Sequence, residues 1–296
     1  MIDFTNKTLL YISTKIENKL IQNNRISFAI ENPDLELNNR SYKTWVNLAE
    51  IYFCKMLTPK VIDNKLVEIT FKKLNRENSF HSTPITNQLE KYGVDSKFFD
   101  INKNEEPTFL NAYKRALESV KIQNRRYILD LGINKGDEFE LIQQLIDKDT
   151  FDSMQLIGVD HAQTALDYAK KRFPKDNVKF YNHDINRLEE LKLQKSDLII
   201  SIGTLQTPNI NYKPFLMSLV QEYLTDNGAF ILGFPNSRWI DNELIYGAKA
   251  PNYPYSEMSL LYNDVIFAKK YLQQKRFRVT ITGREYIFLT ATRIRI

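Results

Sequence analysis

Apolar residues recur along the second half of the chain in short runs, and stretches with helical spacing separate these runs. Four runs of strand length each carry an aspartate at or near one end, at residues 127–131, 156–160, 180–185 and 197–203. Short apolar runs of this kind are consistent with strands buried in a parallel sheet. Their alternation with helices predicts a doubly wound sheet with a ligand along its carboxyl edge.

The pattern continues to the end of the chain with further helices and strands. Helices are predicted at residues 108–120, 137–147, 162–173, 212–224 and 259–274, and strands at residues 229–234, 277–282 and 286–292. The last two strands are joined at Gly283-Arg284, a tight connection that is typical of an antiparallel pair. The predicted fold class is therefore α/β, with a mostly parallel seven-stranded sheet and an antiparallel C-terminal strand.

The first 75 residues have a different pattern. Apolar side chains at helical spacing predict a helix over residues 5–21, with Thr5 or Asn6 as its cap. A second helix is predicted over residues 41–57, and strands over residues 25–30 and 66–74. We therefore predict a small N-terminal α+β module over residues 1–75, ahead of a core over residues 127–296.

Between these parts lies a connector, residues 76–126, whose first thirty residues are polar and lack periodicity. A segment of this length without secondary structure is usually a functional lid, a linker or disordered. Its aromatic side chains and histidine, which a flexible linker does not need, are Phe80, His81, Tyr92, Phe98 and Phe99. The segment is either an active-site lid or a packed connector.

The turn after the first core strand reads Asp130-Leu131-Gly132-Ile133-Asn134-Lys135-Gly136. Glycines let a ligand approach the backbone, and the N–H groups at the start of the next helix favour a carboxylate. Asn134 tolerates a left-handed backbone better than other non-glycine residues. Asp160 ends the second strand, where a carboxylate can accept hydrogen bonds from ribose hydroxyls.

Taken together, these motifs resemble the class I S-adenosylmethionine-dependent methyltransferases over residues 127–296, in the branch acting on small molecules or tRNA. That family has D/E-x-G-x-G-x-G in the first turn, and here Asn134 stands for the middle glycine. The resemblance implies S-adenosyl-L-methionine as cofactor and methyl transfer by in-line displacement. The cofactor-binding residues that it implies are Asp130, Gly132, Asn134, Gly136, Asp160, His161, Asp184, Ile185, Ser201 and Gly203.

Other readings of the same residues exist. The aspartates could be caps and turn residues of an ordinary α/β domain. A nicotinamide-binding fold lacks support, because its G-x-G-x-x-G is absent. A regulatory or interaction protein with a degenerate methyltransferase fold is the alternative that the replacement at Asn134 keeps open.

No catalytic residue is predicted, because methyl displacement mainly needs the acceptor held in line and dehydrated. Candidates for contacting the acceptor lie outside the four motifs: Phe80, His81, Arg238, Trp239 and Tyr253. Arg238 beside Trp239 could clamp an anionic or planar substrate, or the pair could be a packed Trp with a surface Arg. The acceptor is expected to be a small molecule or an RNA, without a choice between them.

Composition and charge bear on disulfides, metal sites, membrane association and nucleic-acid binding. A single cysteine, Cys54, excludes an intramolecular disulfide, and with three histidines a metal site is not expected. Without an apolar stretch of membrane-spanning length or a visible signal peptide, a cytoplasmic protein with no membrane association is expected. The net charge of +5 arises before residue 127, since basic and acidic residues balance after it. A basic face can attract RNA, but it is more often a solvated surface. The oligomeric state is not predicted.

Overall fold

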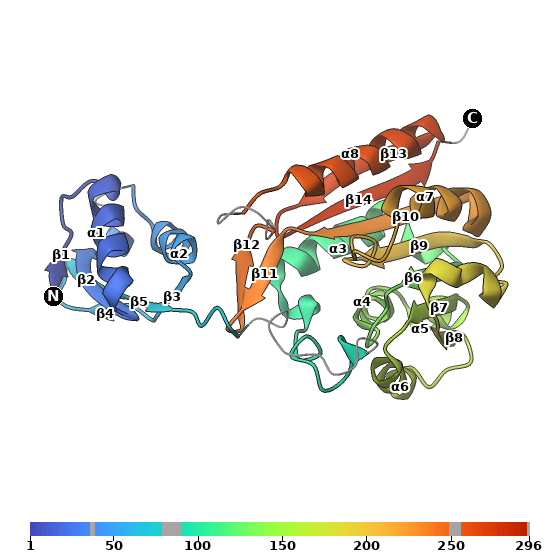
Figure 1. The fold of residues 1–296 in the computed structure, drawn as a ribbon, viewed down its shortest axis with the longest axis horizontal. Coiled ribbons are helices and arrows are strands. Elements are labelled where there is room, and N and C mark those ends of the chain that lie inside the picture. Colours follow the sequence, from blue (N-terminus) through green and yellow to red (C-terminus); the bar gives the residue numbers. More distant parts are fainter. Residues whose placement is uncertain (36–38, 79–89, 249–255, 295–296) are drawn as a thin grey trace. The chain divides into compact units, whose positions relative to one another are not determined.

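The computed structural model describes residues 1–35, 39–78, 90–248 and 256–294 (Figure 1). Its contacts divide the chain into two compact units. Unit 1 consists of Met1–Ser82 together with Trp239–Tyr246, and unit 2 consists of Thr83–Arg238 and Gly247–Ile296. The predicted division into module, connector and core stays a prediction.

Unit 1 is a small α+β structure. Its sheet has the order β1-β2-β5-β3, with β4 also pairing with β5. Its elements are β1 (Ile2–Asp3), α1 (Leu9–Gln22), β2 (Arg25–Glu31), a 3-10 turn (Pro33–Leu35), α2 (Tyr42–Ile51), β3 (Cys54–Met56), β4 (Lys60–Val61) and β5 (Leu66–Lys73). Phe28 lies at the centre of the core, with its ring 5.1–5.7 Å from those of Phe4, Trp45 and Phe71.

Two helices of unit 1 are shorter than the sequence pattern predicts. The first begins at Leu9, because Thr8 is the cap and accepts a hydrogen bond from Tyr11 N. The second ends at Ile51. Phe53 has a left-handed backbone (φ 52°), and a right-handed helix cannot continue through such a residue. Residues 54–56 instead form β3, which extends the sheet by pairing antiparallel with β5.

A two-stranded hairpin, β11 (Ser237–Ile240) and β12 (Glu243–Tyr246), was not predicted. Both residues of its turn, Asp241 and Asn242, have positive φ (52° and 64°), as a type I′ turn requires. The Asp241 carboxylate accepts hydrogen bonds from Asn75 N and Asn78 Nδ2. These bonds explain why a segment so distant in sequence belongs to unit 1.

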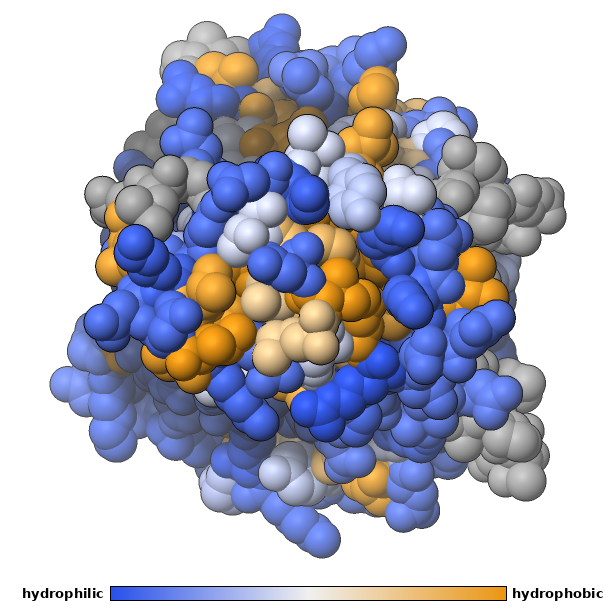
Figure 2. All heavy atoms as spheres, turned by 90° about the vertical axis from the view of Figure 1, so that its left-hand side faces the viewer, coloured by the Kyte–Doolittle hydropathy of each residue, from blue (hydrophilic) through white to orange (hydrophobic). Residues whose placement is uncertain are grey.

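Unit 1 also presents apolar side chains on its surface, among them Leu10, Ile21, Ile51 and Val61. Figure 2 shows one face of the molecule on which apolar side chains gather within a hydrophilic rim. Some apolar positions in the sequence pattern of this unit therefore lie on its surface and not in its core.

Unit 2 contains a seven-stranded sheet with the order β13-β14-β10-β9-β6-β7-β8 (Figure 1). All strands run parallel except β14, which is antiparallel to both of its neighbours. The strands are β6 (Tyr127–Leu131), β7 (Gln155–Asp160), β8 (Val178–Asn182), β9 (Ser196–Ile202), β10 (Leu224–Pro235), β13 (Phe277–Gly283) and β14 (Tyr286–Arg293). The predicted fold class is confirmed.

Helices cover both faces of this sheet. The helices are α3 (Pro107–Ser119), α4 (Asp137–Leu145), α5 (Lys148–Asp152), α6 (Gln163–Arg172), α7 (Tyr212–Ser218), a π-helix (Leu219–Tyr223) and α8 (Ser259–Gln274), with 3-10 turns at Lys103–Glu105, Ile122–Asn124 and Ile185–Leu191. One buried cluster contains side chains of α3 to α6, and the other contains side chains of α7 and α8. Alternate residues of β6 serve the two clusters, since Ile128 belongs to the first and Leu129 to the second.

The strand order reverses direction at β6, which lies between β7 and β9. In open α/β sheets, ligands bind outside the carboxyl ends of the strands at such a switch point. The glycine turn that follows β6 lies at this place, so the fold positions the predicted site where the topology favours one.

Some boundaries in unit 2 differ from the prediction. The strand expected at residues 180–185 is β8, which ends at Asn182. The strand expected from residue 229 begins at Leu224, with an irregularity between Leu224 and Ala229 in its pairing with β9. In the described part of the chain, no helix has the length and apolar character needed to cross a bilayer.

Candidate functional site

The turn after β6 has a left-handed backbone at three positions, Gly132, Asn134 and Gly136 (φ 83°, 48° and 88°). A Cβ at Gly132 would lie 1.9 Å from Thr204 Oγ1, and one at Gly136 would lie 2.8 Å from the Phe173 ring. Close packing within the protein therefore already requires these two glycines. At position 134, asparagine adopts the strained conformation, as the sequence led us to expect.

Asp160 is the residue that ties the end of β7 to this turn. Its Oδ2 accepts from Asn134 N and its Oδ1 from Ala162 N, both at 2.9 Å. The residue is 6% exposed, and His161 Nδ1 lies 3.7 Å from Oδ1. A carboxylate has about four acceptor positions, so two remain for the hydroxyls of a sugar.

Asp130 lies near the end of β6 and is 1% exposed, yet its Oδ2 has no hydrogen-bond donor among the described residues. Burial raises the pKa of Asp130 well above its ordinary range, and the charge of Glu138 raises it further while Lys103 opposes the shift. Leaving a buried acceptor unpaired costs about 1–3 kcal/mol. The arrangement therefore suits a ligand group that donates to this oxygen.

Glu138 is buried and Lys103 is partly buried, and both interact electrostatically with Asp130. Burial raises the pKa of Glu138 to about 7, with Lys103 acting against it and Asp137 and Asp160 adding to it. Burial alone would lower the pKa of Lys103, but interactions with Tyr286 and Glu138 outweigh it and raise that pKa. The sequence analysis did not identify either residue, although Asp137-Glu138 at a helix start directly after the turn was a usable signal.

The remaining predicted cofactor residues have separate roles in the fold. Ser201 is buried and donates to Leu131 O at 3.0 Å, so its hydroxyl joins β9 to β6. Gly203 (φ 77°) donates from its N–H to Gly233 O. Asp184 is exposed and caps the following 3-10 turn through Asn186 N, whereas Ile185 is buried.

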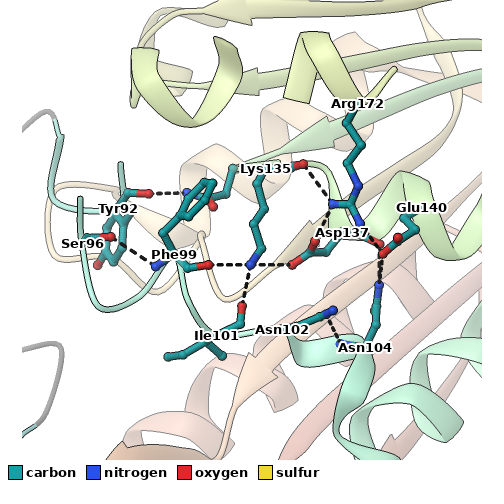
Figure 3. A network of polar contacts seen from close by, with 11 residues as sticks. Tyr92, Ser96, Phe99, Ile101, Asn102, Asn104, Lys135, Asp137, Glu140 and Arg172 are labelled. Atoms are coloured by element: carbon teal, nitrogen blue, oxygen red, sulfur yellow. Dashed lines mark hydrogen bonds and ion pairs between the residues drawn. The ribbon is translucent and has the colours of Figure 1, made fainter. Parts of the chain in front are cut away.

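Residues 90–105, here named the cover segment, are bonded to the glycine turn and its flanking helices (Figure 3). Asn134 Nδ2 donates to Tyr92 O at 2.7 Å, and Lys135 Nζ donates to Phe99 O at 2.5 Å and Ile101 O at 2.9 Å. Asn104 Nδ2 donates to Asp137 O at 2.8 Å. The side chain at position 134 therefore provides a bond to the cover segment that glycine cannot provide.

Two further contacts hold the neighbouring helices in place. Glu90 accepts from Gln163 N and from Thr164 Oγ1 at the start of α6. Arg172, near the end of α6, donates to Asp137 Oδ1 at 2.7 Å and forms an ion pair with Glu140 on α4 (Figure 3). The two helices that begin at the carboxyl edge of β6 and β7 are thus fixed by charge as well as by packing.

The candidates for contacting the acceptor are less completely placed. Phe80, His81 and Tyr253 lie outside the described residues. Arg238 is in unit 2, where its Nη2 lies 3.4 Å from Ser256 Oγ, whereas Trp239 is in unit 1. The expected substrate contacts of these residues stay predictions.

Four buried acceptor oxygens were not predicted from the sequence. Asn104 Oδ1, Gln206 Oε1, Asn236 Oδ1 and Glu285 Oε2 have no donor within the described ranges of the chain. Gln206 follows β9, and Asn236 and Glu285 lie where β10 ends and β14 begins. No local pattern marks an unpaired oxygen, because pairing depends on residues far apart in sequence. For the residues that the structure describes, no group of three side chains has the arrangement of a metal site.

Residues 122–277 match a family model described as a methyltransferase domain, which is more than half of the chain. No curated protein matches the sequence.

Several solved structures are similar in fold. The N-methyltransferase NodS from Bradyrhizobium japonicum, in complex with S-adenosyl-L-homocysteine, has a TM-score of 0.47 and 15% identity, with 74% of this chain and 100% of that chain covered. TehB from Haemophilus influenzae has a TM-score of 0.43 and 12% identity, with 79% and 72% covered. For coclaurine N-methyltransferase the TM-score is 0.36 and the identity 20%, and the match spans 43% of this chain but only 36% of that enzyme.

Proposed function

The chain belongs to the methyltransferase-domain family, and from this premise we propose that it transfers a methyl group from S-adenosylmethionine to a small-molecule acceptor. The observation that carries the proposal is the pair of buried aspartates at the switch point. Asp160 retains two acceptor positions, and Asp130 retains an oxygen without a donor in the described chain.

These residues fit the two polar ends of the cofactor. Asp160 would hold the ribose hydroxyls, and the unpaired oxygen of Asp130 suits the ammonium of the amino-acid end. Asp184 and Ile185 would contact the adenine, as the resemblance implies. S-adenosylmethionine supplies an electrophilic methyl group on a sulfonium, so the chain's task is to hold the acceptor in line and to exclude water.

The position of the cover segment favours a small acceptor over a large one. Its bonds from Asn134, Lys135 and Asn104 keep it on the carboxyl edge of the sheet. A segment in this position would exclude water from the reacting groups and limit the size of the acceptor. We propose that it acts as the active-site lid.

RNA is the second candidate acceptor, because three cations lie in register across the sheet of unit 1. Lys72 on β5 is the partner of Arg25 on β2 and of Lys55 on β3. Like charges directly opposite each other are destabilising, so such a row favours an anion. Glu243 Oε1 lies 3.4 Å from Lys55 Nζ and neutralises part of the positive charge of this row.

A transfer assay separates the candidates. The full chain is incubated with S-adenosylmethionine labelled in the methyl group, together with either a low-molecular-mass metabolite fraction or total RNA. We expect label in the small-molecule fraction. Label in RNA alone, with an RNA affinity that falls steeply with salt, would establish the second candidate instead. No transfer to either fraction would contradict the proposal.

A further inference from the structure

Two neighbouring acceptor oxygens are buried beyond the carboxyl end of β10. They are Oδ1 of Asn236, a residue 1% exposed, and Oε2 of Glu285, a residue 7% exposed. The residues are adjacent, since Asn236 N donates to Glu285 O at 2.8 Å. Within the described part of the chain, neither oxygen receives a hydrogen bond. Together they are two buried acceptors whose hydrogen bonds are not made within the described chain.

The orientation of both side chains is fixed by Arg284. Asn236 Nδ2 donates to Arg284 O at 3.0 Å, and flipping the amide would set two oxygens against each other. Glu285 Oε1 pairs with Arg284 Nε at 3.0 Å, which leaves Oε2 as the remaining oxygen. Rotating either group would therefore still leave a buried oxygen without a hydrogen-bond donor.

This place adjoins the end of β9, where the reacting groups are expected. Pro235, directly before Asn236, packs on Gly203, because a Cβ at Gly203 would lie 3.2 Å from the proline ring. A second carboxyl group is close enough to interact with Glu285, since burial and then the charge of Glu285 raise the pKa of Glu106. The Arg284 guanidinium offsets part of the Glu285 charge, and the two oxygens that remain favour a hydrogen-bond donor over an anion.

We propose that Asn236 and Glu285 bind the acceptor and that this acceptor is a small amine. The inference rests on the proposed function and narrows its acceptor class. An amine offers two or three N–H donors and carries a positive charge when protonated, whereas an alcohol or phenol offers one donor and no charge. Phosphorylated acceptors, RNA among them, would meet the carboxylates of Glu285 and Glu106.

The reaction balances as a displacement. The ammonium form of the acceptor gives one proton to water, and the free lone pair on nitrogen attacks the methyl carbon. A nitrogen–carbon bond forms while the carbon–sulfur bond breaks, and its electron pair stays on sulfur. The products are the N-methylated amine, as its ammonium, and S-adenosylhomocysteine. Asn236 Oδ1 and Glu285 Oε2 accept the remaining N–H groups and hold the nitrogen in position.

The test compares amines with matched alcohols, using the full chain and S-adenosylmethionine. The probes are benzylamine, tyramine and putrescine, and their counterparts are benzyl alcohol, tyrosol and 1,4-butanediol. Mass spectrometry distinguishes N-methyl from O-methyl products. We expect N-methylation of at least one amine and at least tenfold slower methylation of its counterpart. Equal or faster methylation of the alcohols, or no N-methylated product, would overturn the inference.

Glu285→Gln keeps the shape of the side chain and removes its charge. We expect kcat/KM for the amine to fall about tenfold or more, with the affinity for S-adenosylhomocysteine unchanged. Glu118→Gln, on the surface of α3, is the matched control and should change neither quantity. An unchanged amine rate in Glu285→Gln would also overturn the inference. Absence of S-adenosylhomocysteine binding to the native chain would instead contradict the proposed function itself.

Discussion

Asp160 has two tasks at the residue scale, because it orients the glycine turn and is proposed to hold the ribose. Asp160→Ala removes the acceptor for Asn134 N and Ala162 N. We expect the affinity for S-adenosylhomocysteine, measured by calorimetry, to fall by about 1–3 kcal/mol. Asp176→Ala, an exposed change after α6, serves as control. Equal affinity in a folded Asp160→Ala protein would refute the assignment.

Glu138 predicts a pH dependence of stability. Its pKa is raised to about 7 by burial, above an ordinary value of 4.5, so the folded state keeps a proton that the unfolded state has released. The free energy of unfolding should therefore fall as pH rises from 4.5 to 7, by up to about 3 kcal/mol from this residue. Urea unfolding at pH 5 and pH 7 measures the change.

Glu138→Gln should remove most of that dependence, because glutamine does not titrate. The native chain should lose more stability between pH 5 and pH 7 than the variant does. Identical pH profiles would mean that Glu138 is ionised throughout this range, and the description of the buried charges would be wrong.

Several features of individual residues could be predicted from the sequence. The left-handed backbone at Asn134 and the position of Asp160 at the end of its strand were both predicted and are both present. The pairing of Asn134 with Tyr92 was not predictable, because it joins residues 42 positions apart through a backbone carbonyl that has no sequence signature.

At the scale of elements, Lys135 joins the glycine turn to the cover segment through two hydrogen bonds. Lys135→Met keeps most of the apolar stem and removes the hydrogen bonds to Phe99 O and Ile101 O. We expect amide hydrogen exchange in residues 92–101 to become about tenfold faster or more, given about 1.5–3 kcal/mol for bonds to a charged group. Lys171→Met, exposed on α6, is the control. Unchanged exchange would show that other contacts hold the segment.

Elements were predicted well where a continuous hydrophobic pattern defines them, as in the strands of the large sheet. They were predicted poorly where a single residue ends them. Phe53 stops α2 with a positive φ, and Asp241-Asn242 forms a tight turn. A phenylalanine gives no such signal in advance, and the hairpin of residues 237–246 gains its place from partners such as Asn78.

At the scale of the whole molecule, the unfolding of each unit can be followed by a different signal. The only tryptophans of the chain, Trp45 and Trp239, both belong to unit 1, whereas the proposed cofactor residues belong to unit 2. A ligand that binds one folded unit stabilises that unit. S-adenosylhomocysteine should therefore raise the melting temperature seen by circular dichroism and leave the tryptophan fluorescence transition unchanged. Equal shifts in both signals would mean that the units unfold together.

The central claim is that the glycine turn after β6 and the aspartates beside it bind S-adenosylmethionine. A crystal structure of the chain with S-adenosylhomocysteine tests it most directly. We predict ribose hydroxyls within hydrogen-bonding distance of Asp160 and the amino-acid end beside Asp130 and the turn. The ligand bound elsewhere, or no ligand at the turn at saturating concentration, would contradict the account.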